Sequence, residues 1–201
     1  VSNATAGLML SLKALDISEN DEIIIPDMTF VATANAVLSC NATPVLADVT
    51  YEDLNISIDS IEENITNKTR AIIPVHFAGK SCNMKQIMKI AKKYDLKIVE
   101  DCAHALGTFY NKKHVGTFGD TGCFSFYPTK NLTTFEGGMI TCKSKSIANY
   151  LQKARNHGID KSLRDRFTKG YPWEFDIETF GYNYRLDEIR SALGNNQLKR
   201  L

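Results

Sequence analysis

The feature that most constrains the fold of this chain is the alternation of short apolar runs with longer amphipathic stretches. The short runs have the length and apolar content of buried strands. They are Glu22–Pro26, Pro44–Ala47, Ala71–His76, Lys97–Glu100, Gly122–Phe126 and Met139–Thr141. The amphipathic stretches are typical of helices and comprise Ala6–Leu15, Val31–Ser39, Ile58–Ile65, Met84–Tyr94, Ser146–Asn156 and Asp187–Leu201. This order predicts an α/β fold with a mostly parallel sheet and helices on both of its faces.

The composition is that of an ordinary globular protein. The 201 residues are 43% hydrophobic, which is enough to form a core. A formal net charge of +1 gives no basic surface for nucleic acid or for an anionic membrane. The sequence has neither an apolar run long enough to span a bilayer nor the start of a secretory signal. We therefore expect a cytoplasmic protein without nucleic-acid or membrane partners.

The cysteines agree with this location. Cys40, Cys82, Cys102, Cys123 and Cys142 are odd in number, widely spaced and mostly set in apolar runs. No C-x-x-C pair occurs, which argues against zinc and against a thioredoxin-like redox site. The pattern predicts reduced and mostly buried thiols, and no metal site.

Polar and aromatic residues gather just after the expected strands. Ligands of open α/β sheets bind beyond the carboxyl ends of the strands, so these residues should face one another at one edge of the sheet. An acid, hydroxyl groups, a lysine, histidines and aromatic rings at one edge together indicate a binding site. The residues concerned are Thr29, Phe30, His76, Asp101, His104, Ser125, Tyr127 and Lys130.

The chemistry of these positions points to one cofactor. A lysine that is desolvated at the end of a buried strand, as expected for Lys130, can form a Schiff base with an aldehyde. Asp101 follows an apolar run, and a buried carboxylate needs a cationic partner such as a protonated pyridine nitrogen. The stretch Ser2–Gly7 opens a helix, whose free N–H groups suit a phosphate, and Ser125 can add a hydroxyl group. Together these partners describe pyridoxal 5'-phosphate.

The same stretches resemble the DegT–StrS family of pyridoxal-phosphate-dependent nucleotide-sugar aminotransferases. The resemblance runs from Val1 to Leu201, and its motifs are specific in combination. They are Ser2–Ala6, Asp21–Pro26, Thr29–Asn35, Ala71–His76, Glu100–Gly107, Ser125–Lys130, Glu136–Gly138 and Gly181–Arg185. The resemblance implies the type I fold of aspartate aminotransferase and a homodimer with shared active sites.

The resemblance also implies roles at the cofactor. Lys130 matches the lysine that forms the Schiff base and carries the proton of the 1,3-shift. Asp101 matches the acid paired with the pyridine nitrogen, and Phe30 matches the aromatic ring stacked on the cofactor. The cradle of the phosphate is matched by Thr5, Ala6 and Ser125.

Further residues are implied to lie around this centre. Asn183 matches an asparagine that binds the phosphate in the site of the neighbouring subunit. His104 and Tyr127 are expected beside the site, in contact with the sugar. One position departs from the family pattern, because Phe135 stands before Glu136 where a small residue is usual. A bulky ring there could alter substrate access or cofactor packing.

The activity implied by the resemblance is transfer of an amino group from an amino acid, with glutamate as the expected donor, to a keto-sugar carried on a nucleotide. The stretches Phe77–Ser81 and His104–Gly107 resemble members that act at C4 of UDP-linked 4-keto-6-deoxy sugars in polysaccharide synthesis. Family members are longer at both ends. Residues 1–201 are therefore expected to be the cofactor-binding large domain of a longer chain, without the small C-terminal domain.

Other interpretations stay open. Another type I cofactor enzyme, such as a cysteine desulfurase or an aldolase, would share the fold but would not be expected to carry Gly181–Arg185. A catalytically silent or regulatory member of the same family would keep the motifs. Lys130 argues against the dehydratase branch of the family, in which histidine replaces the lysine. Amination of a keto-sugar by the intact protein would separate these alternatives.

Overall fold

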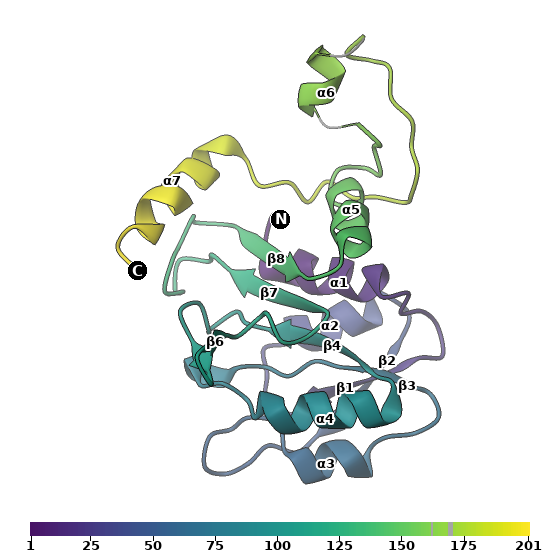
Figure 1. Ribbon diagram of the computed structural model, residues 1–201, viewed down its shortest axis with the longest axis vertical. Coiled ribbons are helices and arrows are strands. Elements are labelled where there is room, and N and C mark those ends of the chain that lie inside the picture. Colours follow the sequence, from purple (N-terminus) through teal and green to yellow (C-terminus); the bar gives the residue numbers. More distant parts are fainter. Residues whose placement is uncertain (162, 169–170) are drawn as a thin grey trace.

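A central sheet organises the chain in the computed structural model, which describes residues 1–161, 163–168 and 171–201 (Figure 1). The strand order in this sheet is β2–β1–β3–β4–β7–β8. The strands are β1 (Glu22–Pro26), β2 (Thr43–Ala47), β3 (Thr69–Ile72), β4 (Lys97–Asp101), β7 (Thr121–Ser125) and β8 (Gly138–Cys142). All neighbouring pairs are parallel except β7 and β8, which are antiparallel. The expected mostly parallel sheet is therefore confirmed.

Helices cover both faces of the sheet, as the sequence predicts (Figure 1). On one face, α1 (Ala4–Ala14) packs against α2 (Ala32–Leu38), α5 (Lys145–Ala154) and the strands β7 and β8. On the other face lie α3 (Ile58–Glu63) and α4 (Met84–Tyr94), with α4 against β4. Each face has its own buried apolar cluster, and successive residues of β1 contribute to opposite clusters.

Two elements coincide with their predicted bounds, and local signals explain why. β1 begins at Glu22 and ends at Pro26, as expected. α4 begins after Asn83, whose side chain accepts a hydrogen bond from the N–H of Gln86, and it ends where Asp95 adopts a left-handed conformation. Helix α1 begins two residues before its predicted start, because the Asn3 side chain caps it by accepting from Ala6 N.

Other boundaries differ from the prediction. β3 ends at Ile72 instead of His76, and beyond it Val75 makes only an isolated bridge to Asp101. Pro74 lies between them and has no N–H to donate to a neighbouring strand. Several short elements are not predicted from the sequence: the 3-10 turn η1 (Phe77–Gly79), the hairpin of β5 (Phe109–Tyr110) with β6 (Lys113–His114), and α6 (Leu163–Thr168).

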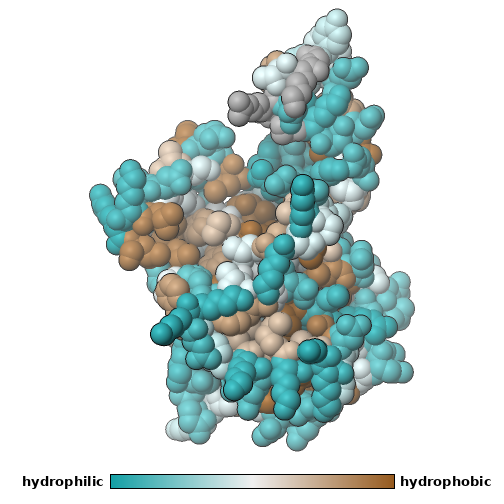
Figure 2. All heavy atoms as spheres, viewed as in Figure 1, coloured by the Kyte–Doolittle hydropathy of each residue, from teal (hydrophilic) through white to brown (hydrophobic). Residues whose placement is uncertain are grey.

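The chain after α5 leads away from the sheet to α6 and returns to α7 (Glu188–Leu198) (Figure 1). α7 has no buried residue, and Ile189 is 85% exposed. Figure 2 shows hydrophobic residues gathered beside α7, whereas mostly hydrophilic residues cover α3 and α4. Of the apolar residues of α7, Ile189 and Leu198 are exposed, whereas Leu193 is half-buried.

The cysteines and the helices agree with two further expectations. All five cysteines are free, and only Cys142 is not fully buried. In the described ranges, no helix has both the length and the apolar character needed to cross a membrane.

Candidate active site

A cavity of about 720 Å³ lies at the carboxyl ends of β1, β4 and β7, beside the start of α1. It is the edge at which ligands bind in open α/β sheets. The structure brings seven of the nine residues with predicted roles into its lining: Thr5, Phe30, Asp101, His104, Ser125, Tyr127 and Lys130. These side chains come from segments that are far apart in the sequence, so the fold itself assembles the cavity.

Glycine at position 138 allows α1 to begin at this edge. A Cβ atom at Gly138 would lie 2.6 Å from the backbone carbon of Asn3, which is closer than real Cβ atoms come. The N–H of Gly138 donates to the carbonyl of Val1 at 2.9 Å. The start of α1 is therefore held directly against β8, with Asn3 and Thr5 at the cavity wall.

Asp101 ends β4 and provides a nearly buried carboxylate, which is only 5% exposed. Its Oδ2 accepts a hydrogen bond from the Thr33 hydroxyl at 2.9 Å, and its Oδ1 accepts one from Ala103 N at 3.1 Å. Burial raises the pKa of this carboxyl group, while the two hydrogen bonds act in the opposite direction. A cationic group in the cavity would favour the ionised form further.

Lys130 lies in the turn that follows β7, where its backbone N–H donates to the carbonyl of Tyr127 at 3.0 Å. Burial lowers the pKa of its amine, and the charge of Asp101 only partly opposes this shift. A lowered pKa increases the fraction of neutral amine, which is the nucleophilic form. Lys130 therefore combines access to the cavity with a more reactive amine than that of a surface lysine.

Aromatic and imidazole groups complete the wall. Phe30 is 74% exposed although it lines the cavity, so one face of its ring is available to a ligand. His104 contacts the ring of Phe77 edge-on, with centroids 6.2 Å apart. Burial, and after it the charge of Lys130, lower the pKa of His104. His104 is thus favoured in its neutral form, in which it can both donate and accept hydrogen bonds.

The predicted phosphate cradle is only partly in the lining. Thr5 and Ser125 face the cavity, whereas Ala6 is buried behind it. The N–H of Ala6 already donates to Asn3 Oδ1 at 2.8 Å. An anion that binds this N–H would have to displace the Asn3 cap, so the role of Ala6 stays a prediction.

Asn183 and Phe135 both lie outside this lining. Asn183 is exposed and forms an isolated antiparallel bridge with Asn156, so its predicted role in the site of a neighbouring subunit stays a prediction. Phe135 is also exposed, and its φ of +65° lies in the left-handed region. That conformation is unfavourable for a bulky residue, which gives a backbone reason for the small residue expected there.

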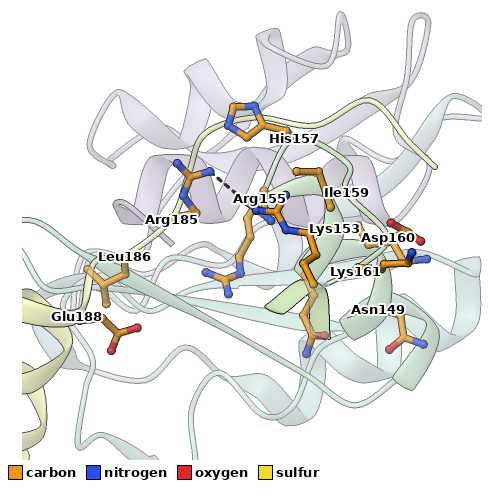
Figure 3. Close-up of a pocket in the computed structure, with 13 residues that line it drawn as sticks. Asn149, Lys153, Arg155, His157, Ile159, Asp160, Lys161, Arg185, Leu186 and Glu188 are labelled. Atoms are coloured by element: carbon orange, nitrogen blue, oxygen red, sulfur yellow. Dashed lines mark hydrogen bonds between the residues drawn. The ribbon is translucent and has the colours of Figure 1, made fainter. Parts of the chain in front are cut away.

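A second cavity, of about 900 Å³, lies between the end of α5 and the segment before α7, and it shares no described lining residue with the first (Figure 3). Figure 3 shows the basic residues Lys153, Arg155, Lys161 and Arg185 around it. Several of them have protein partners: Lys153 pairs with Glu178, and Arg185 donates to Asn156 Oδ1 at 2.8 Å. This cavity is not predicted from the sequence, because its residues come from segments that are separated along the chain.

Behind the first cavity, a buried group of polar residues holds the sheet edge together. Successive side chains of a strand point to opposite faces of the sheet, so Glu100, which precedes Asp101 in β4, lies on the face opposite to it. Its Oε1 accepts from Phe118 N and Gly119 N at 2.7 and 2.8 Å, and its Oε2 accepts from Gly116 N at 2.7 Å and His76 Nε2 at 3.1 Å. His76, Glu100 and Cys102 are close enough to hold a metal ion. The carboxylate oxygens and both imidazole nitrogens nevertheless have protein partners, so the arrangement is that of a structural hydrogen-bond centre.

The comparisons with known proteins agree with this architecture. The model of the DegT/DnrJ/EryC1/StrS aminotransferase family matches residues 1–201. The chain is 41% identical to the spore coat polysaccharide biosynthesis protein SpsC of Bacillus subtilis, over 100% of this chain and 52% of that protein. The chain spans about half the length of the curated relatives that it matches.

Solved structures show the same fold. The aminotransferase from Psychrobacter cryohalolentis superposes with a TM-score of 0.93 at 38% identity, over 100% of this chain and 51% of that one. The PLP form of the sugar aminotransferase Spr1654 from Streptococcus pneumoniae, described as putative, gives 0.88 at 34% identity, over 99% and 54%. The fold is therefore that of the pyridoxal-phosphate-dependent aminotransferases, as the sequence predicts. By its sequence and its fold, the chain belongs to the DegT/DnrJ/EryC1/StrS aminotransferase family.

Proposed function

We propose that the intact protein is a pyridoxal-phosphate-dependent aminotransferase that moves an amino group from an amino acid to a keto-sugar carried on a nucleotide. The observation that carries this proposal is the pair of Lys130 and Asp101, which face one cavity from different strand ends. An amine of lowered pKa and a nearly buried carboxylate are the two groups that the cofactor's aldehyde and ring nitrogen require. Family membership supports the same activity.

The residues of the cavity fit this cofactor. The carboxylate of Asp101 is held by Thr33 and Ala103, and burial leaves it in need of a cationic partner. The start of α1 beside Ser125 offers hydrogen-bond donors and a positive helix end for a phosphate. When bound, the cofactor supplies an electron sink for the loss of a proton from the amino-acid carbon.

Each protein group then has a defined task. Lys130 would bind the cofactor covalently through its neutral amine and would hold and return the proton at its Nζ. Asp101 would hold the ring nitrogen through its negative charge, which would favour a proton on that nitrogen. Phe30 would cover the ring and exclude water from it. Thr5, Ala6 and Ser125 orient the phosphate.

For the substrate, we propose a UDP-linked 4-keto-6-deoxyhexose aminated at C4, with glutamate as the donor. His104 and Tyr127 line the cavity and would contact the sugar. SpsC is named as a polysaccharide biosynthesis protein, and Spr1654 is described as a sugar aminotransferase. Both support a sugar substrate, and the name of SpsC supports a sugar made for a polysaccharide.

We further propose that the protein acts in the cytoplasm as a homodimer with shared active sites. Residues 1–201 would form its cofactor-binding large domain, and a small C-terminal domain would follow. The exposed apolar residues on α7, such as Ile189 and Leu198, provide a surface for association. Asn183 would bind the cofactor phosphate of the partner.

A catalytically silent or regulatory member of the family is the alternative. Such a protein would keep the cavity but would not need a lysine amine with a lowered pKa. Burial lowers the pKa of the Lys130 amine. The discriminating experiment offers the intact protein a panel of nucleotide-linked keto-sugars together with glutamate. An aminated sugar identified by NMR would support the proposal and locate the reacting carbon. No amination of any sugar in the panel, by protein that binds pyridoxal phosphate, would favour the alternative.

A further inference from the structure

A short chain of hydroxyl groups leads from α2 to the carboxylate of Asp101. Thr29 Oγ1 lies 2.8 Å from Thr33 Oγ1, and Thr33 Oγ1 lies 2.9 Å from Asp101 Oδ2. Thr33 is fully buried, so water does not compete for its hydroxyl. The two threonines flank Phe30, and Thr29 lines the cavity itself.

The direction of these hydrogen bonds follows from the chemistry of the groups. An ionised carboxylate has no proton to give, so the Thr33 hydroxyl must donate to Asp101. A hydroxyl has a single proton, and that of Thr33 is then used. Thr29 must therefore donate to Thr33. The Thr33 hydroxyl thus accepts from Thr29 and donates to Asp101.

The rest of Asp101 is held as well. Its Oδ1 accepts from Ala103 N at 3.1 Å. Its backbone N–H donates to the Pro74 carbonyl at 2.9 Å, and its carbonyl accepts from His76 N at 3.1 Å. The main chain is thus fixed by β3 and its extension, and Thr33 is the side-chain donor that determines how the carboxylate is turned.

The ionisable groups around Asp101 lie on β4, on the strands beside it and on the loops that follow these strands. His76 lies on the extension of β3, while His104 and Lys130 lie on the loops that follow β4 and β7. The cysteines Cys102 and Cys123 are buried beside it, and Glu100 precedes it on the opposite face of β4. Burial raises the pKa of Asp101, and the hydrogen bonds from Ala103 and Thr33 lower it. Thr33 is the one uncharged side chain among these described partners that donates directly to the carboxylate.

We propose that Thr33 is a positioning residue that holds the carboxylate of Asp101 in its ionised form and turned toward the cavity, with Thr29 holding the Thr33 hydroxyl as a donor. The link to a ring nitrogen rests on the proposed function, whereas the effect on Asp101 does not. The hydroxyl does not touch the reacting atoms. It acts through Asp101 alone. Loss of the hydroxyl should therefore change the pH at which the carboxyl group of Asp101 ionises.

The test compares isosteric variants of the intact protein. Thr33→Val removes the hydroxyl and keeps the shape, Thr33→Ser keeps the hydroxyl, and Thr29→Val removes the donor behind it. Thr121→Val is the matched control, because Thr121 is also a fully buried threonine but its hydroxyl has no hydrogen-bond partner among the described residues. The protonated carboxyl band of Asp101 is followed by infrared spectroscopy against pH, without cofactor, and is assigned by its loss in Asp101→Asn.

In Thr33→Val we expect Asp101 to protonate at a pH higher by about one unit or more, since a hydrogen bond to a charged group favours the ionised form by that order. Thr29→Val should shift the titration in the same direction by less. Thr33→Ser and Thr121→Val should titrate like the wild type. Equal titration of Thr33→Val and the wild type would overturn the proposal. If Thr33→Val does not fold, either of two other results would overturn the proposal. One is a Thr29→Val variant in which Asp101 titrates as in the wild type. The other is a Thr33→Ser variant in which Asp101 titrates a full pH unit higher than in the wild type.

A second readout uses the protein reconstituted with pyridoxal phosphate. Thr33→Val should lower kcat by about tenfold per unit of that shift and leave KM nearly unchanged, because the Thr33 hydroxyl does not face the substrate. A loss confined to KM would contradict the positioning role. The infrared titration needs no cofactor, so it tests the role of Thr33 even if the protein is not an aminotransferase. Failure of the positioning role and failure of the proposed function are therefore distinguishable.

Discussion

The imidazole of His76 and the carboxylate of Glu100 meet in the interior with no exposure to solvent, their Nε2 and Oε2 atoms 3.1 Å apart. Cys82 N donates to the other imidazole nitrogen, Nδ1, at 3.1 Å. Nδ1 is therefore an acceptor, and the ring proton is on Nε2, which donates to Glu100. With three backbone N–H groups also donating to it, Glu100 fastens the Gly116–Gly119 turn to the back of the strand that carries Asp101.

This relationship makes Glu100 a stability determinant with a defined pH dependence. Burial alone would raise its pKa, but the hydrogen bonds from His76, Gly119 and Gly116 outweigh burial and lower it. A carboxyl group with a lowered pKa stabilises the fold above its ordinary value of 4.5 and loses that effect as the pH falls through the folded-state pKa. Glu100→Gln should therefore lower the free energy of unfolding at pH 7 by about 3 kcal/mol, because an amide N–H₂ would face backbone donors.

Urea unfolding of the intact protein at pH 7 and below pH 4 checks this expectation. The difference between Glu100→Gln and the wild type should shrink at the lower pH. Glu62→Gln is the control, because Glu62 pairs with Lys93 at 3.0 Å on the surface, where solvent screens the pair. Equal stability of the two variants at pH 7 would contradict the role assigned to Glu100.

Asp101 should act through its charge more than through its shape. Asp101→Asn keeps the size of the side chain and its place beside Thr33, but it no longer favours a proton on a ring nitrogen in the cavity. We expect the variant to bind pyridoxal phosphate and to lose about 100-fold in kcat, since two pKa units correspond to a factor of that size. Asp53→Asn, at a half-exposed pair with Lys80, is the control. Near-normal turnover of Asp101→Asn would make Asp101 a structural acid.

Much of this fold follows from local sequence patterns. Elements that are too short to show such a pattern are not predicted. α4 was predicted to the residue because Met84, Ile87, Ile90 and Ala91 recur at helical spacing after a capping Asn83. The hairpin of β5 and β6 has two residues in each strand, too few for a period-two pattern to appear.

The candidate site was predictable as a set of strand ends, but its supporting contacts were not. Positions such as Asp101 and Lys130 follow apolar runs, and their convergence is a property of parallel sheets. Thr33 and Asp101 are 68 positions apart, and His76 and Glu100 are 24 apart, so no local signal joins them. The one local hint was the spacing of Thr29, in the loop before α2, and Thr33, in its first turn, which are four residues apart.

The proposed shared active site predicts complementation between two inactive variants. Lys130→Ala removes the amine within a subunit, and Asn183→Ala would remove a phosphate contact made to its partner. A mixed dimer then has one site with neither lesion, so random exchange between equal amounts of the two proteins in a closed two-fold assembly should restore roughly a quarter of the wild-type activity. Subunit exchange is verified separately by native mass spectrometry with isotope-labelled protein. Exchange without restored activity would exclude Asn183 from the partner's site.

The most direct test of the central claim is the chemical identity of the residue that holds the cofactor. The intact protein is incubated with pyridoxal phosphate, reduced with borohydride, digested and analysed by mass spectrometry. We expect the pyridoxyl group on Lys130 and its absence from the Lys130→Ala variant, while Lys80→Ala, a change at an exposed lysine paired with Asp53, labels like the wild type. A pyridoxyl group on another lysine in the wild type, or none on any lysine, would contradict the account.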